Sequence, residues 1–152
     1  MLQLLRNMLL VNFSSNSELR IIEKAAFNDS VIETFTIPPS VEMFNEFYNY
    51  KLKQVIVSPT NNNFRWTDDN LLLGKTNVNS DEFKLLVFAC KDIKYAKIPS
   101  NIKCIGPYCF SLYQNLRNVE FSPDSDLRFS TTESLNAAFS LIRIIELHFL
   151  RM

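Results

Sequence analysis

Glycine and histidine are almost absent from this chain, whose 152 residues include two glycines, one histidine and one tryptophan. Gly74 and Gly106 are isolated in the sequence, so no glycine-rich loop can cradle a phosphate. The one histidine, His148, could serve in a serine or cysteine triad, but it lies in an irregular segment near the C-terminus, where a preorganised site is hard to hold. We therefore predict that the protein is not an enzyme and uses no cofactor.

Cysteines are few and odd in number. Cys90, Cys104 and Cys109 lack the spacing of a zinc site. The neighbours of the last two are apolar, which favours buried free thiols that pack as small hydrophobic residues. A Cys104–Cys109 disulfide is the alternative. The Asp-Ser-Asp segment at residues 124–126 begins like a calcium loop, but the twelfth position is Leu135 instead of glutamate. The sequence therefore predicts no metal site.

An excess of charge of either sign is also missing. The 16 lysines and arginines balance the 16 acidic residues and are dispersed among them. This balance disfavours nucleic acid and anionic membranes as partners. No apolar run approaches the ~20 residues that span a bilayer, so we expect no membrane insertion. The chain is nevertheless 47% hydrophobic and contains 13 phenylalanines, which is typical of a globular protein.

Six short segments share one spacing of three apolar residues, with two free positions after the first and one after the second. They are Met8-Val11-Phe13, Ile32-Phe35-Ile37, Leu52-Val55-Val57, Ile93-Ala96-Ile98, Leu116-Val119-Phe121 and Ile142-Ile145-Leu147. Most neighbouring triads lie between 20 and 29 positions apart, which is the period of leucine-rich repeats. The sequence therefore predicts a leucine-rich-repeat solenoid.

Each repeat also suggests its own local structure. The end of a triad alternates apolar and polar residues, as a strand with one buried face does. A proline follows at position 38, 59, 99 or 123 and ends strand pairing. The apolar pairs Val41-Phe44 and Ile102-Ile105 then suit one helical or 3₁₀ turn on the opposite wall. We expect a β-rich α/β fold, a single domain over residues 1–152, without caps at either end.

The interval from Val57 to Ile98 is about twice one repeat. Leu71-Leu72-Leu73 and residues 84–89 read as two strands, joined by a polar stretch. Asparagine and aspartate at positions 61–63 and 68–70 predict turns before them. We therefore predict an inserted β-hairpin at about residues 61–92, with Trp66 as its packing anchor.

Two segments resemble a known family, the BspA-like leucine-rich repeats of anaerobic bacteria and parasitic protists. Residues 98–110, Ile-Pro-Ser-Asn-Ile-Lys-Cys-Ile-Gly-Pro-Tyr-Cys-Phe, are similar to that family's Ile-Pro-x-x-Val-x-x-Ile-Gly-x-x-Ala-Phe unit. Residues 17–27 resemble its Leu-x-x-Ile-x-x-x-Ala-Phe half. The insert is similar to a hairpin-bearing variant of the unit. The resemblance implies ligand binding or adhesion, often at a cell surface, and no catalysis.

The free positions of the strands predict the binding surface, because in a repeat horseshoe they form a ladder on one face. The candidate binding residues are Thr34, Thr36, Gln54, Ile56, Tyr95, Lys97, Asn118 and Glu120. Leu10 with Asn12, and Ile144 with Glu146, would form the outermost rungs. This mixture of apolar, amide and singly charged groups suits a protein or peptide partner, with Tyr95 as the best anchor. The alternative is a structural fragment of a longer array, or an intracellular scaffold, without its own ligand.

The sequence contains features that favour two different compartments. The segment Met1–Phe13 is faintly like a signal peptide, but Val11 and Phe13 already belong to the first repeat and no small-residue cleavage site follows. An absent signal peptide and an odd number of cysteines favour the cytoplasm. The family resemblance favours the cell surface instead.

Overall fold

The computed structural model describes residues 10–24, 26–27, 30–44, 51–111, 113–127, 138–139 and 146–148. These residues form strands and turns, and none of their elements is a helix. The strands are β1 (Leu10–Val11), β2 (Ile21–Ile22), β3 (Thr34–Ile37), β4 (Met43–Phe44), β5 (Gln54–Val57), β6 (Phe64–Trp66), β7 (Leu71–Lys75), β8 (Phe83–Ala89), β9 (Tyr95–Ile98), β10 (Cys104–Ile105), β11 (Asn118–Phe121) and β12 (Glu146–His148).

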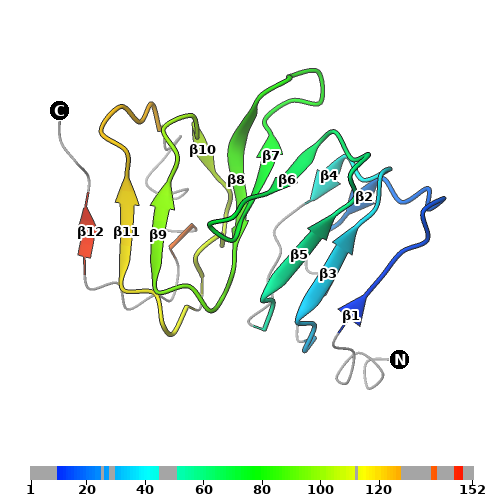
Figure 1. The fold of residues 1–152 in the computed structure, drawn as a ribbon, viewed down its shortest axis with the longest axis horizontal. Helices are drawn as coiled ribbons and strands as arrows, with labels where there is room; N and C mark the ends of the chain where they lie inside the picture. Colours follow the sequence, from blue (N-terminus) through cyan, green and yellow to red (C-terminus); the bar gives the residue numbers. More distant parts are fainter. Residues whose placement is uncertain are drawn as a thin grey trace.

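The triad strands stack side by side as predicted. Two parallel sheets result, in the orders β1-β3-β5 and β12-β11-β9, on either side of the long hairpin in Figure 1. Phe35 stands opposite Val55, and Val119 opposite Ala96, so equivalent triad positions meet from repeat to repeat. These four side chains are buried. The apolar residues of these triads therefore face the interior of the protein, as their alternation predicts.

The predicted helical turns on the opposite wall are wrong for the described residues. After the turn closed by the Val41 amide on the Pro38 carbonyl, the chain extends into β4, and β10 follows the equivalent turn at Pro99. β2 and β4 pair in parallel. Val41 and Phe44 are both buried, as their spacing suggested. Backbone hydrogen bonds to the neighbouring repeat keep this segment extended. The three-residue spacing of the apolar pair is also compatible with a helical turn, so the spacing alone does not distinguish the two structures.

The insert contains the predicted hairpin and one further strand. β7 pairs antiparallel with β8, and β6 pairs antiparallel with β7. β10 then pairs in parallel with the middle of β8, at Leu85 and Leu86. The hairpin strand β8 therefore pairs with β10 in the same way that β2 pairs with β4 on the wall opposite the triad strands. Trp66 lies on β6 and is partly buried against the core, in keeping with its predicted role as an anchor.

The hairpin also separates two hydrophobic cores. Leu71, Leu73 and Leu86 belong to the cluster on the C-terminal side. Leu72 and Phe88 belong to the cluster on the N-terminal side. Both faces of the hairpin are thus buried, which explains the almost unbroken apolar runs of these two strands.

The three cysteines are free thiols. Cys90 and Cys109 are buried, as expected, while Cys104 is partly exposed and forms no disulfide with Cys109. Burial raises the pKa of the Cys109 thiol far above its ordinary value. Within the part of the chain described above, no helix is long and apolar enough to cross a membrane.

Candidate functional site

The predicted binding residues lie on the outward faces of two separate sheets. Strand pairing places Thr34 beside Gln54 and Thr36 beside Ile56 on the β3-β5 face. We call these four residues the N-terminal patch. Alternation along each strand points these side chains away from the buried triad positions. Ile56 keeps 45% of its surface exposed, which is unusual for a large aliphatic side chain in a sheet.

The other four predicted residues form an equivalent group on β9 and β11, which we call the C-terminal patch. Tyr95 pairs in register with Asn118, and Lys97 with Glu120. Tyr95 has 67% of its surface exposed, the largest exposed fraction among the large hydrophobic side chains in the described residues. Lys97 is also exposed, while Asn118 and Glu120 are half-buried. The patch combines one aromatic ring with one cation and one anion.

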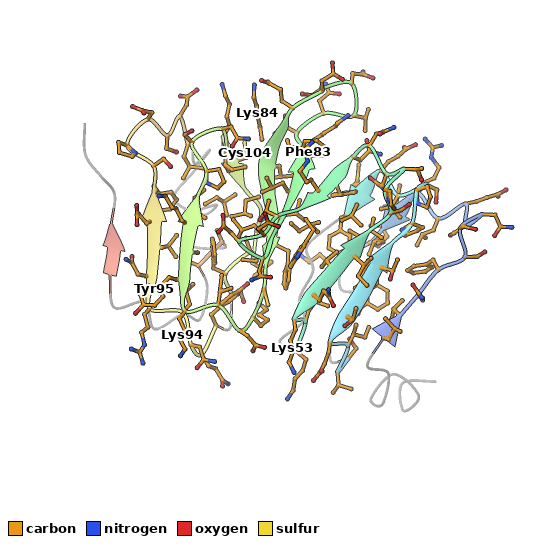
Figure 2. The ribbon with its side chains drawn as sticks, in the orientation of Figure 1. Lys53, Phe83, Lys84, Lys94, Tyr95 and Cys104 are labelled. Atoms are coloured by element: carbon orange, nitrogen blue, oxygen red, sulfur yellow. The ribbon has the colours of Figure 1, made fainter. Side chains whose placement is uncertain are left out.

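The two patches do not form one continuous ladder, contrary to prediction. β5 and β9 are not paired. Figure 2 shows Lys53 at one end of β5 and Tyr95 on β9, on either side of the hairpin. The chain returning from β8 instead docks at the start of β5, where the Lys91 amide donates to the Leu52 carbonyl and the Cys90 thiol donates to the Lys53 carbonyl. These contacts lie just before β5, and β9 belongs to a separate sheet.

The last rung is also displaced by two residues. Glu146 stands opposite Asn118, and His148 opposite Glu120, so the rung is Glu146 and His148 in place of the predicted Ile144 and Glu146. The segment Ile-Arg-Ile-Ile-Glu-Leu-His-Phe at residues 142–149 fits the triad spacing in two registers. Pairing with β11 selects the later one. The triad residues Met8, Ile142 and Ile145 lie outside the described residues.

A cleft of about 840 Å³ opens beside β5, and no sequence pattern predicts it. The whole of β5 and the following turn form one side, and β6 with the hairpin forms the other. Its distinctive side chains are Arg65, Trp66, Lys75, Asp81 and Phe83. The Arg65 guanidinium lies 4.4 Å from the centre of the Phe83 ring, and the Lys75 ammonium lies 5.9 Å from it. The cleft therefore brings two cations onto one aromatic ring.

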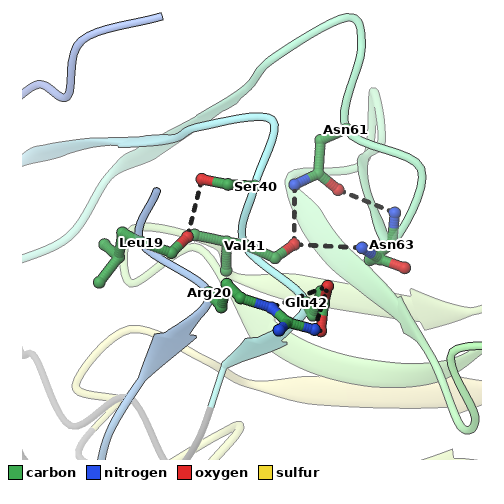
Figure 3. Close-up of polar contacts among 7 residues, drawn as sticks. All are labelled: Leu19, Arg20, Ser40, Val41, Glu42, Asn61 and Asn63. Carbon is green, nitrogen blue, oxygen red and sulfur yellow. Dashed lines mark hydrogen bonds and ion pairs between the residues drawn. The ribbon is translucent and has the colours of Figure 1, made fainter. Parts of the chain in front are cut away.

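Polar side chains fix the turns between the walls, as Figure 3 shows. Asn61 is buried, and its amide nitrogen donates to the carbonyls of Pro38 at 2.8 Å and Val41 at 3.0 Å. Its side-chain oxygen accepts from the backbone amides of Asn63 and Phe64. One side chain thus satisfies backbone groups of two successive repeats. This network is structural and rigidifies the turn that leads into the cleft.

A buried lysine joins the insert to the repeat that follows it. Lys91 has 8% of its surface exposed, and its ammonium donates to the Ser111 carbonyl at 2.7 Å. It lies 4.1 Å from the centre of the Tyr113 ring and 5.4 Å from that of Phe88. Burial lowers its pKa to about 8. No carboxylate pairs with it in the described residues, and its ring and carbonyl contacts indicate a structural role.

Metal binding finds no support in the described residues, which contain no group of three or more histidine, cysteine, aspartate or glutamate side chains able to hold an ion. His148 lies on β12, paired with Glu120.

Short parallel strands stacked one per repeat, with proline turns and a second wall, define a leucine-rich-repeat solenoid. The chain belongs to the BspA-type leucine-rich-repeat family, because residues 3–78 and 75–149 match six copies of the BspA type leucine rich repeat region. This confirms the resemblance noted in the sequence. No curated protein sequence matches the chain.

Two crystal structures are similar to this one. A leucine-rich repeat protein from Eubacterium ventriosum has a TM-score of 0.57 and 24% identity, and the match covers 70% of this chain and 28% of that protein. The pneumococcal vaccine antigen PcpA has a TM-score of 0.43 and 17% identity, and the match covers 89% of this chain and 44% of that protein. The likeness to the first protein supports the fold alone. This chain spans less than half the length of either relative.

Proposed function

We propose that this protein is a non-catalytic module that binds another protein through the outward face of its triad strands, with the C-terminal patch as the main contact. The observation that carries the proposal is the exposure of Tyr95, 67% of whose surface is open on a strand paired in register with β11. Exposed aromatic residues on rigid strands carry much of the energy of protein interfaces. Lys97 and Glu120, paired beside it, add one charge of each sign.

Family membership supports a role in recognition, because repeat solenoids present a scaffold whose exposed positions carry specificity. The finer reading, a surface antigen or adhesin-like binder, is part of this proposal and follows from the family resemblance. A ligand on another cell or on extracellular matrix would be its natural partner. Labelling of intact cells with a membrane-impermeant reagent tests that reading, and a protected protein would contradict it.

The binding surface is tested by the double variant Tyr95→Ala with Lys97→Ala. Tagged wild-type and variant chains are expressed in the native cell, and the proteins captured by each are quantified by mass spectrometry. We expect a captured partner to fall by roughly tenfold or more, because an aromatic anchor and a charge are lost together. The unfolding temperature should stay within a few degrees, since both side chains are exposed.

A matched control removes apolar surface from the opposite wall. Ile21→Ala with Met43→Ala truncates two exposed side chains, with 43% and 47% of their surfaces open, on the paired strands β2 and β4. Capture should be unchanged in this variant. Equal capture by the wild type and the Tyr95/Lys97 variant would reject the C-terminal patch as the binding surface.

A further inference from the structure

The edge of β5 that faces the hairpin is open. The amides of Gln54 and Ser58 donate toward the neighbouring strand β3, to the carbonyls of Glu33, just before it, and Ile37, at its end. Backbone groups of alternate residues in a strand point to the same edge, so the N–H and C=O groups of Val55 and Val57 point the other way. No strand of the described residues pairs with that edge. Cys90 and Lys91 close it only at its start, at Lys53 and Leu52.

This open edge lies directly in the cleft. All four β5 residues, Gln54–Val57, line the cleft, and its opposite side is formed by β6 and the hairpin. An unpaired strand edge is a template for a further strand, and strand addition is a common mode of peptide recognition. The cleft gives that edge a defined opposite side, which an ordinary exposed edge lacks. A ligand that pairs with Val55 and Val57 would therefore also contact Trp66 or Phe83.

The charges of the cleft identify the chemistry of such a ligand. Arg65 and Lys75 both lie against the Phe83 ring, and neither makes an ion pair within the described residues. Asp81 is the one acidic residue of the lining, so the cations are in excess. A guanidinium held over an aromatic ring presents its edge to a carboxylate with little further loss of side-chain freedom. The cleft thus favours an acidic side chain on the incoming strand.

We propose that an extended peptide segment of a partner protein adds as a strand to the open edge of β5, with an acidic residue against Arg65 and Lys75. The proposal rests on the proposed function in one respect, namely that the ligand is another protein. The surface it uses is distinct from the C-terminal patch. Backbone pairing with Val55 and Val57 supplies the alignment. The cationic pair on Phe83 supplies the selectivity for acidic sequences.

The single tryptophan offers a direct readout, because Trp66 lines the cleft itself. The probes are two capped peptides of alternating threonine and valine, with two glutamates at the N-terminal end of one and at the C-terminal end of the other. They are titrated into the full chain while tryptophan fluorescence is recorded and calorimetry measures total binding. We expect one peptide to bind saturably and to change the fluorescence of Trp66 with the same affinity in both measurements.

Two sets of variants separate backbone pairing from charge. Val57→Pro removes an outward amide, and Arg65→Glu with Lys75→Glu reverses the cationic pair; each should weaken binding by roughly tenfold or more. Val78→Pro is the control, because it alters a backbone amide in the exposed loop between β7 and β8, outside the cleft lining. Its affinity for the peptide should equal that of the wild type. Circular dichroism checks that each variant is folded.

N-methylated peptides test the pairing without changing the protein, so the result stands even if Val57→Pro fails to fold. Methylation at alternate positions should abolish binding, and at the intervening positions it should be tolerated. The proposal is overturned if methylation has no effect at any position, if binding leaves Trp66 fluorescence unchanged, or if neither peptide binds at about 1 mM. Such a result leaves the proposed function intact, since that function is tested at Tyr95 and Lys97.

Discussion

The N-terminal and C-terminal sides of the hairpin each contain a parallel three-stranded sheet, but different side chains fill their hydrophobic cores. On the N-terminal side, Phe35 is in contact with the rings of Phe13, Phe27 and Phe44 at centroid distances of 5.7, 5.0 and 5.9 Å, all edge-to-face. On the C-terminal side, Phe110 contacts two rings, and the buried Lys91 lies close by over Tyr113. Strand spacing is set by backbone hydrogen bonds, so a solenoid tolerates different side chains between its walls provided that they fill the same layer.

The largest loss of stability should come from removing Phe35, which contacts three other phenylalanine rings on the N-terminal side. Phe35→Ala leaves a cavity among three rings, and we expect a loss of about 3–5 kcal/mol in the free energy of unfolding. Because repeats contact mainly their neighbours, hydrogen exchange should accelerate most in β1, β3 and β5 and least in β9 and β11. Phe110→Ala should reverse this pattern. Uniform acceleration in both variants would show that the hairpin couples the two sides into one cooperative unit.

The buried cation on the C-terminal side predicts a pH-dependent difference. The pKa of Lys91 is about 8 in the folded protein and 10.5 ordinarily, so the cost of burying the charge is present in full below pH 8 and disappears as the pH rises toward 10.5. Lys91→Met removes this cost. The stability of the wild type relative to the variant should therefore increase with pH, by up to about 3 kcal/mol between pH 7 and pH 10.5.

Urea denaturation of both proteins across this pH range measures the difference. Burial raises the pKa values of Cys109 and Tyr113, which lowers stability at high pH, but both groups are present in the two proteins, so the loss that burial causes is common to both. Lys94→Met, at an exposed position, is the control and should show no such trend. A pH-independent difference for Lys91→Met would mean that Lys91 is not buried as a titrating cation.

A smaller difference in stability is expected between alanine variants of two asparagines, Asn61 and Asn101, which lie in equivalent turns. Asn61→Ala removes a buried amide that bonds to backbone groups on both sides, and we expect a loss of about 2 kcal/mol. Asn101 is exposed and makes one bond, to the Phe83 carbonyl at 2.9 Å. Asn101→Ala should cost no more than about 1 kcal/mol. Thermal unfolding of the two variants measures the contrast, and equal losses would show that burial of Asn61 adds nothing.

Much of the fold is readable from the sequence because its signal is local. The triads place β3, β5, β9 and β11 correctly, since alternation of apolar residues reports directly which side of a strand is buried. The hairpin strands β7 and β8 are readable instead from their short, almost unbroken apolar runs, because both of their faces are buried. The second wall is not readable in this way, because a buried pair three residues apart fits a turn of helix and a turn followed by a strand equally well.

The candidate site is less predictable. The outward residues of both patches follow from strand alternation, and the structure pairs them in the expected register within each half. The break between the patches has no local signal, because it depends on Cys90 and Lys91 reaching back to Lys53 and Leu52 across the insert. The cleft has none either, since Arg65 and Phe83 are separated along the chain by a turn, a strand and a loop.

The sequence by itself determined that this is a repeat solenoid, where its triad strands run, and which side chains they expose, because each of these follows from periodicity over a few residues. Only the tertiary structure decided that the binding wall is divided, that β5 has an open edge in a cationic cleft, and that β12 pairs two residues later than its spacing first suggests. These features depend on which distant segments pair, and pairing is selected by hydrogen bonds and burial across the whole molecule.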